Sequence, residues 1–242
     1  MISKQTNRMA QFFASVTEEA SKPGLDLTTI RDIYEKLHLA ATEPEGVSYA
    51  EVDVDGVPAL WCMPKGCDPN RVLLHSHGGG TVVFSMHLDR KAVGHIAKAA
   101  GVRALVLDYR RSPEYKFPAQ IEDVEKAYHW LLGHGIRPEN IATTGQSIGG
   151  NFAVSLALAL RSKRVVMPAA ILSGGAMVQH GAKQRDDRKQ CRERQASLEA
   201  CVGTVSRVVA RRHRGDLERS PRQSALRRSD RASANPGILR RS

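Results

Sequence analysis

The chain has 242 residues, which is long enough for one sizeable domain with a hydrophobic core. It carries 36 Lys and Arg against 25 Asp and Glu, a formal net charge of +11. No apolar run approaches the ~18 residues of a membrane span, and the N-terminus lacks the apolar core of a secretory signal, so we expect no membrane span and a cytoplasmic location.

The basic charge is concentrated toward the end of the chain. Residues 1–173 hold 19 basic and 18 acidic side chains, whereas residues 174–242 hold 17 basic and 7 acidic ones. All twelve aromatic residues lie at or before Phe152, and Leu, Ile, Val and Phe make up only 10 of the last 69 residues. A segment so charged and so poor in apolar residues is not expected to build a core. We therefore separate a globular body from an Arg-rich tail, residues 174–242, that we predict to be disordered.

The predicted elements begin with two amphipathic helices, over residues 8–21 and 28–40. Thr28 or Thr29 would cap the second helix, because a hydroxyl at that position can accept a bond from a free amide of the first turn. Both helices precede the first strand signal. Residues 1–46 are therefore expected to form a separate helical unit.

Strand patterns follow these helices. Residues 47–64 alternate between apolar and polar side chains and turn at Asp55-Gly56, which is typical of a β-hairpin. Beyond the hairpin, strands are expected at 71–77, 103–109, 140–146 and 168–173, and helices at 88–100, 118–133 and 148–161. This alternation favours an α/β core, residues 47–173, with a mostly parallel sheet covered on both faces. The last helix is apolar on nearly every side and should be fully packed, whereas the acidic residues of the helix before it read as a solvated face.

The segment GQSIGG, residues 145–150, follows one of these strands and opens a helix. A serine on a tight strand-to-helix turn needs small neighbours, and Gly145 and Gly149 would remove side-chain atoms that otherwise collide. The turn would place Ser147 at the positive end of the helix dipole, which favours developing negative charge. These features predict Ser147 as a catalytic nucleophile. The plainer alternative is a glycine-rich turn whose serine only caps the helix.

A second glycine-rich segment, HGGG at 77–80, follows the strand at 71–77. Nucleophilic attack on an ester carbonyl creates an oxyanion that must meet fixed N–H donors. Gly78 and Gly79 can turn their amides toward such an oxygen, and Ile148, the residue after the nucleophile, would supply a third amide. A phosphate-binding loop is disfavoured, because neither G-K-[ST] nor G-x-G-x-x-G accompanies these glycines.

HGGG at 77–80, DYRRSPEYKFPAQIED at 108–123 and GQSIGG at 145–150 occur in this order, and with them the chain resembles the hormone-sensitive-lipase family of α/β-hydrolases. The resemblance covers about residues 8–173. It implies a carboxylic ester hydrolase that works by Ser-His-Asp chemistry without a cofactor or metal. It also implies that the N-terminal helices form a cap over the acyl pocket.

The resemblance carries over to individual residues. Those that match the site are Ser147 as nucleophile, Gly78, Gly79 and Ile148 as oxyanion hole, and His77, Gly80, Gly145 and Gly149 as motif support. His77 is implied to shape the loop and not to act as the base. Positions that brace the sheet and the site match Asp108, Arg110, Pro113, Glu114 and Asp123.

Three positions depart from the family pattern. Thr81 stands where the family usually has an aromatic residue after HGGG. Gln146 replaces the usual Asp before the serine, and Ile148 replaces the usual Ala after it. These changes affect the pocket shape and local hydrogen bonds, and the bulkier Ile148 would narrow the site.

The rest of the triad is not assignable. In this fold an acid and then a histidine follow the nucleophile along the chain. Asp186, Asp187 and His213 stand in that order, but no strand pattern or family-like context surrounds them. We therefore assign no catalytic Asp or His, and we expect feeble or absent turnover. His75, His77, His87 and His95 lack carboxylate or cysteine partners at ligand spacing, so we expect no metal site.

Three explanations of the tail remain open. It could be a basic extension that binds nucleic acid or an acidic partner, an unusual C-terminal module, or a sequence read out of frame. Arg, Ala, Ser and Gly make up 36 of the 69 tail residues, as expected when a GC-rich gene is read out of frame, and we favour this explanation. Nucleic-acid binding is disfavoured, since the tail has no aromatic side chain for stacking.

Together these observations predict a serine esterase or lipase-like hydrolase for a small acyl ester or lactone. The alternative is a non-catalytic truncated product whose basic tail binds nucleic acid or an acidic partner.

Overall fold

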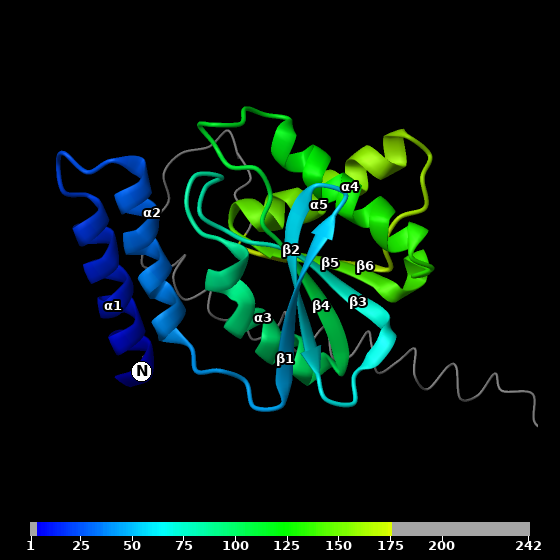
Figure 1. Ribbon diagram of the computed structural model, residues 1–242, viewed down its shortest axis with the longest axis horizontal. Coiled ribbons are helices and arrows are strands. Elements are labelled where there is room, and N and C mark those ends of the chain that lie inside the picture. The colour runs from blue at the N-terminus through cyan, green and yellow to red at the C-terminus, as the bar shows by residue number, and fades with distance from the viewer. Residues whose placement is uncertain (1–3, 176–242) are drawn as a thin grey trace, which may run out of the picture. The chain divides into compact units, whose positions relative to one another are not determined.

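The computed structural model describes residues 4–175, and its elements follow the predicted order (Figure 1). They are α1 (Lys4–Ala20), α2 (Leu27–Glu35), η1 (Lys36–Ala40), β1 (Val47–Val54), β2 (Val57–Pro64), β3 (Asp68–Ser76), α3 (Met86–Ala100), β4 (Val102–Leu107), α4 (Ala119–Gly133), η2 (Pro138–Asn140), β5 (Ile141–Gln146), α5 (Ile148–Ser162) and β6 (Ala170–Gly174). Each predicted strand and helix is present with shifted ends. The predicted second helix gives way to a 3-10 turn after Glu35. The predicted tail lies almost wholly outside the described residues.

Six strands form one sheet in the order β1-β2-β4-β3-β5-β6. β3 pairs in parallel with β4 and β5, and β6 pairs in parallel with β5. β1 and β2 form the predicted antiparallel hairpin around Asp55 and Gly56, and β2 joins β4 antiparallel. The predicted α/β fold with a mostly parallel sheet is confirmed.

Helices cover both faces of this sheet. Figure 1 shows α3 on one side and α4 with α5 on the other. The strand residues alternate accordingly, because successive side chains of a strand point to opposite faces. Val72 and Leu74 belong to the main core cluster with Tyr128 of α4 and Leu156 of α5, whereas the equally buried Leu73 between them does not.

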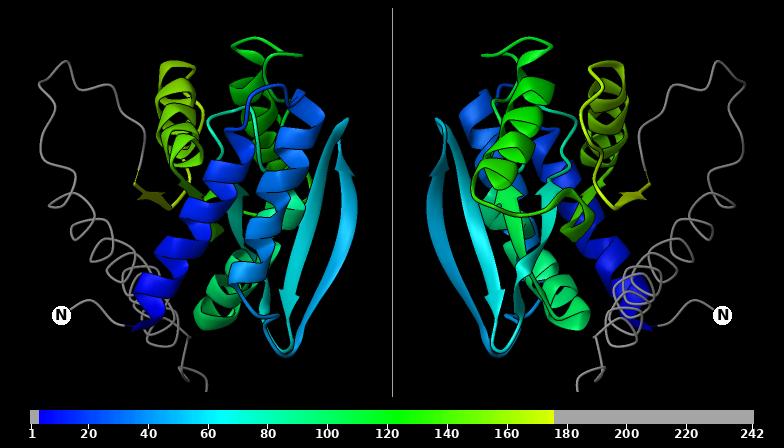
Figure 2. Two further views of the ribbon diagram at one scale, coloured as in Figure 1. Left: turned by 90° about the vertical axis from the view of Figure 1, so that its left-hand side faces the viewer. Right: turned by 90° about the vertical axis from the view of Figure 1, so that its right-hand side faces the viewer.

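The two N-terminal helices pack side by side (Figure 2). They share a small apolar cluster formed by Val16, Ala20, Ile33 and Leu37. Phe84, from the loop before α3, packs against this cluster, and its ring meets Tyr34 edge to face at 5.8 Å between centroids. The helical unit therefore rests on the segment that follows HGGG.

The start of α2 differs from the prediction. Asp26, not Thr28 or Thr29, caps the helix, since its carboxylate accepts a bond from the Thr29 amide at 2.8 Å. Both threonines already lie inside the first turn. Asp and Thr both occur at this position, with Asp the stronger cap, so Asp26 was the better choice from the sequence.

Two expectations about helix surfaces were wrong. α5 is not buried all round within the described part of the chain, since Val154 and Leu158 are 36% and 57% exposed. The acidic residues of α4 do not all face solvent either. Asp123 is only 1% exposed, and its carboxylate accepts bonds from the Arg110 side chain at 2.9 Å and from the Arg110 amide at 2.9 Å. The bracing position implied for Asp123 fits this contact.

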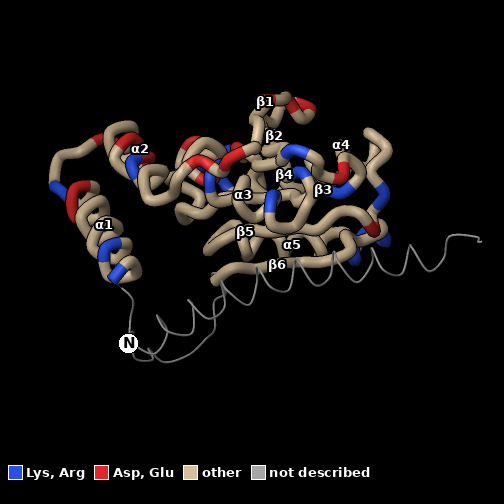
Figure 3. The backbone as a smooth tube through the Cα atoms, turned by 90° about the horizontal axis from the view of Figure 1, so that it is seen from below, with Lys and Arg blue, Asp and Glu red and all other residues tan. Residues whose placement is uncertain are grey.

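Acidic and basic residues are interspersed along the described elements (Figure 3). This distribution agrees with the nearly balanced charge of residues 1–173. Between residues 4 and 175, none of the helices has the length and apolar character required to cross a bilayer.

Candidate active site

The parallel register brings the two glycine-rich segments together. Ser76, the last residue of β3, pairs with Gly145 of β5, so HGGG and GQSIGG leave the sheet at the same level. The next strand ends at the same edge, because the Ser147 amide donates to the Gly174 carbonyl of β6 at 2.9 Å. Open α/β sheets bind ligands at this carboxyl edge.

Ser147 has an unusual backbone. It lies between β5 and α5 with φ 55 and ψ −119, a conformation that residues with a Cβ atom rarely adopt. Its side chain makes no capping hydrogen bond to α5. The alternative in which this serine serves only as a helix cap is therefore not supported, because the capping bond is missing. Helix capping does not explain the backbone strain.

The glycines around Ser147 are required by space. A Cβ atom on Gly145 would lie 2.3 Å from the backbone of Gly149. A Cβ atom on Gly149 would lie 2.0 Å from the Ser76 carbonyl oxygen and 2.6 Å from that of His77. The first turn of α5 thus touches the end of β3 directly, which is possible only without side chains at these positions.

The HGGG segment turns sharply after Gly78. Gly79 has φ 87, and a Cβ atom there would lie 2.1 Å from the Val83 carbonyl oxygen. Gly80 has φ 63 with open space around it, so its conformation, not the available space, favours glycine. A Cβ atom on Gly78 would lie 3.2 Å from the carbonyl oxygen of Gln146, the residue before the serine. The two loops therefore approach each other closely.

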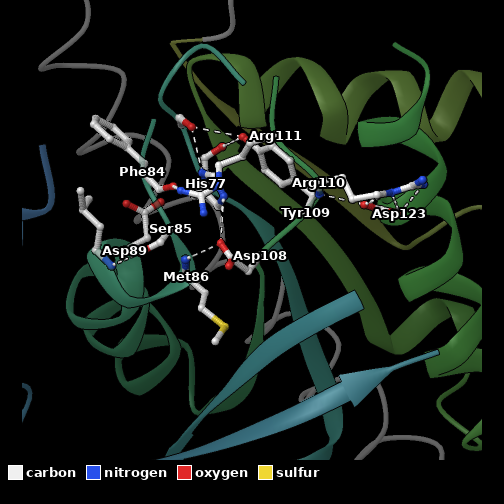
Figure 4. A network of polar contacts seen from close by, with 12 residues as sticks. His77, Phe84, Ser85, Met86, Asp89, Asp108, Tyr109, Arg110, Arg111 and Asp123 are labelled. Carbon is white, nitrogen blue, oxygen red and sulfur yellow. Dashed lines mark hydrogen bonds and ion pairs between the residues drawn. The ribbon is translucent and has the colours of Figure 1, made fainter. Parts of the chain in front are cut away.

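Tyr109 fixes the direction of the HGGG peptides (Figure 4). Its hydroxyl lies 2.9 Å from the His77 carbonyl and 3.1 Å from the Gly78 carbonyl and donates to them. In a planar trans peptide the N–H points opposite to the carbonyl. The amides of Gly78 and Gly79 are therefore directed away from Tyr109.

Three backbone amides at this edge find no acceptor in the described part of the chain. Within residues 4–175, the Gly78, Gly79 and Ile148 amides donate to none of the backbone carbonyls or side chains. Ile148 is the first residue of α5, where amides lack helical partners, and its side chain packs against the main core cluster. Free amides close to a strained serine can stabilise an oxyanion.

His77 is built into the loop and is completely buried. Its ring stacks on Tyr109 at 4.1 Å between centroids, and its Nδ1–H donates to the Gly78 carbonyl at 2.9 Å. Burial lowers the pKa of His77 below its ordinary value, so the ring is neutral at pH 7. These contacts fit the implied role of a loop-shaping residue.

The other histidines of the described chain contact groups away from Ser147. His75 Nε2 lies 2.9 Å from Asp89 Oδ2 in a buried pair. The remaining partners are Glu35 O for His38, Glu51 for His87, Thr42 O for His95, Glu125 for His129 and Trp130 O for His134. Within residues 4–175, no three His, Cys, Asp or Glu side chains are grouped as a metal site. Asp186, Asp187 and His213 lie outside the described residues.

Sequence reasoning missed several residues that support this site. Tyr109 lies within the 108–123 motif, but no role is predicted for it from the sequence. Arg31 of α2 gave no local signal, yet it reaches the loop after HGGG and pairs with Glu114 at 2.7 Å. Arg111 likewise donates to the Phe84 carbonyl at 2.8 Å. Only the three-dimensional structure reveals these contacts, because they join segments far apart in the sequence.

One described cavity, of about 300 Å³, lies elsewhere. Its lining residues are Glu51, Val52, Asp53, Pro58, Ala59 and Met86. None of them belongs to the predicted site.

Comparison with known proteins identifies similar sequences and folds. A family model described as an alpha/beta hydrolase fold matches residues 73–238, which extends beyond residue 173, where the motif resemblance ends. An acetyl-hydrolase of Streptomyces hygroscopicus is 39% identical over 119 residues, covering 49% of this chain and 40% of the relative. An ethyl acetate hydrolase of Pseudomonas putida is 33% identical over 134 residues, covering 51% of this chain and 42% of the relative.

Solved structures give the same result. The crystal structure of an esterase from the bacterial hormone-sensitive lipase family is 38% identical, with a TM-score of 0.64. The match covers 69% of this chain and 56% of that one. The chain therefore spans 40% to 56% of the length of these relatives.

Proposed function

Because the chain belongs to the alpha/beta hydrolase fold family, we propose that it carries the nucleophile and oxyanion-binding part of a carboxylic ester hydrolase. In this proposal residues 1–46 form a cap and residues 47–173 form the hydrolase core. The substrates are small acyl esters or lactones. The names of the acetyl-hydrolase and ethyl acetate hydrolase relatives support a short acyl group.

The observation that carries the proposal is the strained backbone of Ser147, which makes no capping bond and lies beside three amides that have no acceptor within residues 4–175. A serine at this turn could lower its energy by capping α5, and it does not. Strain of this kind persists where the surrounding structure enforces it, commonly at catalytic residues. Gly145 and Gly149 enforce it here through their close backbone contacts.

The proposed reaction is acyl transfer through a serine ester. Ser147 Oγ attacks the carbonyl carbon, a C–O bond forms, and the carbonyl π electrons move onto the oxygen. The amides of Gly78, Gly79 and Ile148 stabilise the resulting oxyanion, which then collapses and expels the alcohol. Water hydrolyses the serine ester in a second cycle of the same steps. No cofactor is needed.

The serine proton must pass to a base, and from there to the departing alkoxide. We assign this base to none of the described histidines, since each contacts groups elsewhere. With no base assigned among residues 4–175, we expect feeble or absent turnover. A site with only the oxyanion hole and binding groups still accelerates acyl transfer, by about 10³–10⁴ over water in serine proteases that lack triad members.

The test is hydrolysis of p-nitrophenyl acetate by the purified chain, with Ser147→Ala as the matched control. The proposal expects a Ser147-dependent release of p-nitrophenol, at least as one burst of acylation per chain. Equal release by both proteins would contradict it.

A second candidate follows from the charge of residues 174–242, with 17 basic and 7 acidic side chains. In this alternative the chain is a non-catalytic product whose tail binds nucleic acid or an acidic partner. Retention on double-stranded DNA that is lost when residues 174–242 are removed, and that weakens as the salt concentration rises, would favour it, because basic side chains bind phosphates in a salt-dependent way.

A further inference from the structure

The segment that follows HGGG is held in an unfavourable backbone form. Positive φ angles occur at Gly79, Gly80, Thr81 and Phe84, and the two non-glycine residues have φ 71 and φ 72. The amides of Val82 and Val83 both donate to the Gly79 carbonyl at 3.0 Å, which closes a tight turn. A strained turn persists only where the surrounding structure holds it. Hydrogen bonds from other segments to its carbonyl groups can do so.

Each end of this segment is held from outside. The Ser112 amide donates to the Thr81 carbonyl at 2.8 Å. Arg31 Nε donates to the Val82 carbonyl at 2.8 Å. Arg111 Nη1 donates to the Phe84 carbonyl at 2.8 Å (Figure 4). Three carbonyls within four residues are therefore fixed by groups from two other segments.

Arg31 connects three parts of the chain. It belongs to α2, and its side chain is only 17% exposed. Besides the Val82 carbonyl, it donates to the Ser112 carbonyl at 3.0 Å and to both carboxylate oxygens of Glu114 at 2.7 Å. Only the planar guanidinium presents enough donors in fixed directions for these contacts. The contact with Glu114 uses the two Nη atoms and is separate from the Nε bond to Val82.

Arg111 contacts the end of the same segment, at Phe84. It follows β4 by a few residues and lies near the carboxylate of Glu35, at the end of α2. Its bond to Phe84 fixes the residue whose ring packs on Tyr34 of the same helix. Both arginines therefore connect α2 with the segment after HGGG.

We propose that Arg31 and Arg111 are positioning residues for the oxyanion hole. They hold residues 79–84 in the strained form that directs the Gly78 and Gly79 amides, and they make α2 part of the apparatus that binds the oxyanion. Neither side chain contacts the reacting atoms. The kinetic part of this inference rests on the proposed ester hydrolase function, whereas its structural part does not.

The experiment compares the variants Arg31→Gln, Arg111→Gln and Arg31→Lys with the wild-type chain. We expect each Gln variant to lower the Ser147-dependent rate of acylation by p-nitrophenyl acetate by about tenfold to a hundredfold, with the ester concentration that half-saturates this rate changed by less than about twofold, because displaced donors weaken the transition state more than substrate binding. Arg31→Lys keeps the positive charge but has a single donor nitrogen, so it can make only some of these contacts and recovers part of the rate. Hydrogen–deuterium exchange of amides 80–84 should be faster in both Gln variants.

Two controls separate loop positioning from general stability. Arg137→Gln removes an exposed arginine whose pair with Glu139 lies away from the loop, and it should match wild type in rate and exchange. Glu114→Gln leaves the Val82 contact of Arg31 possible, so its rate should fall less than that of Arg31→Gln. Equal losses in these two variants would indicate mere anchoring of α2 and overturn the proposal.

Amide exchange of residues 80–84 tests the proposal even if the chain shows no catalysis. If wild type and Ser147→Ala acylate equally, the proposed function fails, and amide exchange alone tests the arginines. Faster exchange confined to residues 80–84 supports the positioning role. Unchanged exchange in both Gln variants overturns it.

Discussion

Ser85 and Ser147 each directly precede a 15-residue helix, α3 and α5 respectively. Ser85 has an extended backbone, φ −152, and its hydroxyl accepts a bond from the Leu88 amide at 3.3 Å. Ser147 has φ 55, and its hydroxyl makes no such bond. One residue type at one position therefore stabilises α3 in the first case and carries strain in the second.

The neighbours of the two serines explain this difference. Ser85 follows a loop whose positive φ angles fall on Thr81 and Phe84, so Ser85 itself keeps an extended backbone that allows it to cap α3. Ser147 follows β5 without a loop, so the chain must reverse direction within one residue. The reversal is possible because Gly145 and Gly149 allow backbone to touch backbone. The comparison thus distinguishes a helix start at which serine caps the helix from one at which serine has a strained backbone and makes no capping bond.

The largest expected effect comes from Gly149→Ala. The added methyl group would lie 2.0 Å from the Ser76 oxygen, so α5 must move away from β3. We expect a loss of about 3 kcal/mol or more in the free energy of unfolding, together with loss of any Ser147-dependent acylation. Urea unfolding monitored by circular dichroism measures the first. Gly133→Ala is the matched control, because a Cβ atom there meets nothing within 4 Å. Equal stability of the two variants would contradict the close packing at the turn.

The sequence predicted the elements and both glycine-rich loops because their signals are local. Alternating apolar residues mark strands, and glycines between a strand and a helix mark sharp turns. Parallel pairing then brings the ends of neighbouring strands together without further information. For this reason HGGG and Ser147 could be expected at one edge of the sheet from the sequence alone.

The contacts that shape the loop could not be predicted in this way. Arg31 and Val82 are 51 residues apart, and Tyr109 and His77 are 32 residues apart. No periodicity reports such pairs. Asp123 shows the same limit, since a carboxylate in an acidic helix reads as solvated unless its distant partner, Arg110, is known.

Ser147→Gly should have the next largest effect on stability. Glycine adopts φ 55 freely, so the strain at the turn, of about 1–3 kcal/mol, is relieved. The greater entropy of glycine in the unfolded chain offsets about 0.5–1 kcal/mol of this. We expect a net gain of about 1 kcal/mol in urea unfolding. Ser147→Ala should remain close to wild type, and a loss of about 1 kcal/mol in that variant would mean that the hydroxyl caps α5 after all.

Ser85→Ala should lower the free energy of unfolding, whereas Ser147→Gly should raise it. It removes the cap of α3 and leaves the Leu88 amide without its partner. We expect a loss of about 1 kcal/mol, and Ser85→Asn, which can accept the same bond, should recover most of it. Stability unaffected by Ser85→Ala would remove the distinction between the two serines.

The smallest effect should depend on pH and concerns Glu35, next to Ser85. Burial raises the pKa of Glu35 above its ordinary value of 4.5, and the Ser85 hydroxyl and the charge of Arg111 only partly oppose this. A raised pKa means that the folded chain binds the proton more tightly than the unfolded chain. The stabilisation is therefore fully present below pH 4.5 and is lost as the pH rises through the folded-state pKa.

Glu35→Gln abolishes this titration, so the variant should gain stability relative to wild type as the pH rises above that point. Glu114 provides a control of opposite sign, because its contact with Arg31 lowers the pKa of Glu114 to about 2. Its stabilisation is present above pH 4.5 and is lost as the pH falls toward 2. The free energy of unfolding of Glu114→Gln should therefore fall furthest below that of wild type at neutral pH. Urea unfolding across this pH range distinguishes the two slopes. Parallel curves for Glu35→Gln and wild type would show that the carboxylate of Glu35 is solvated in the folded chain.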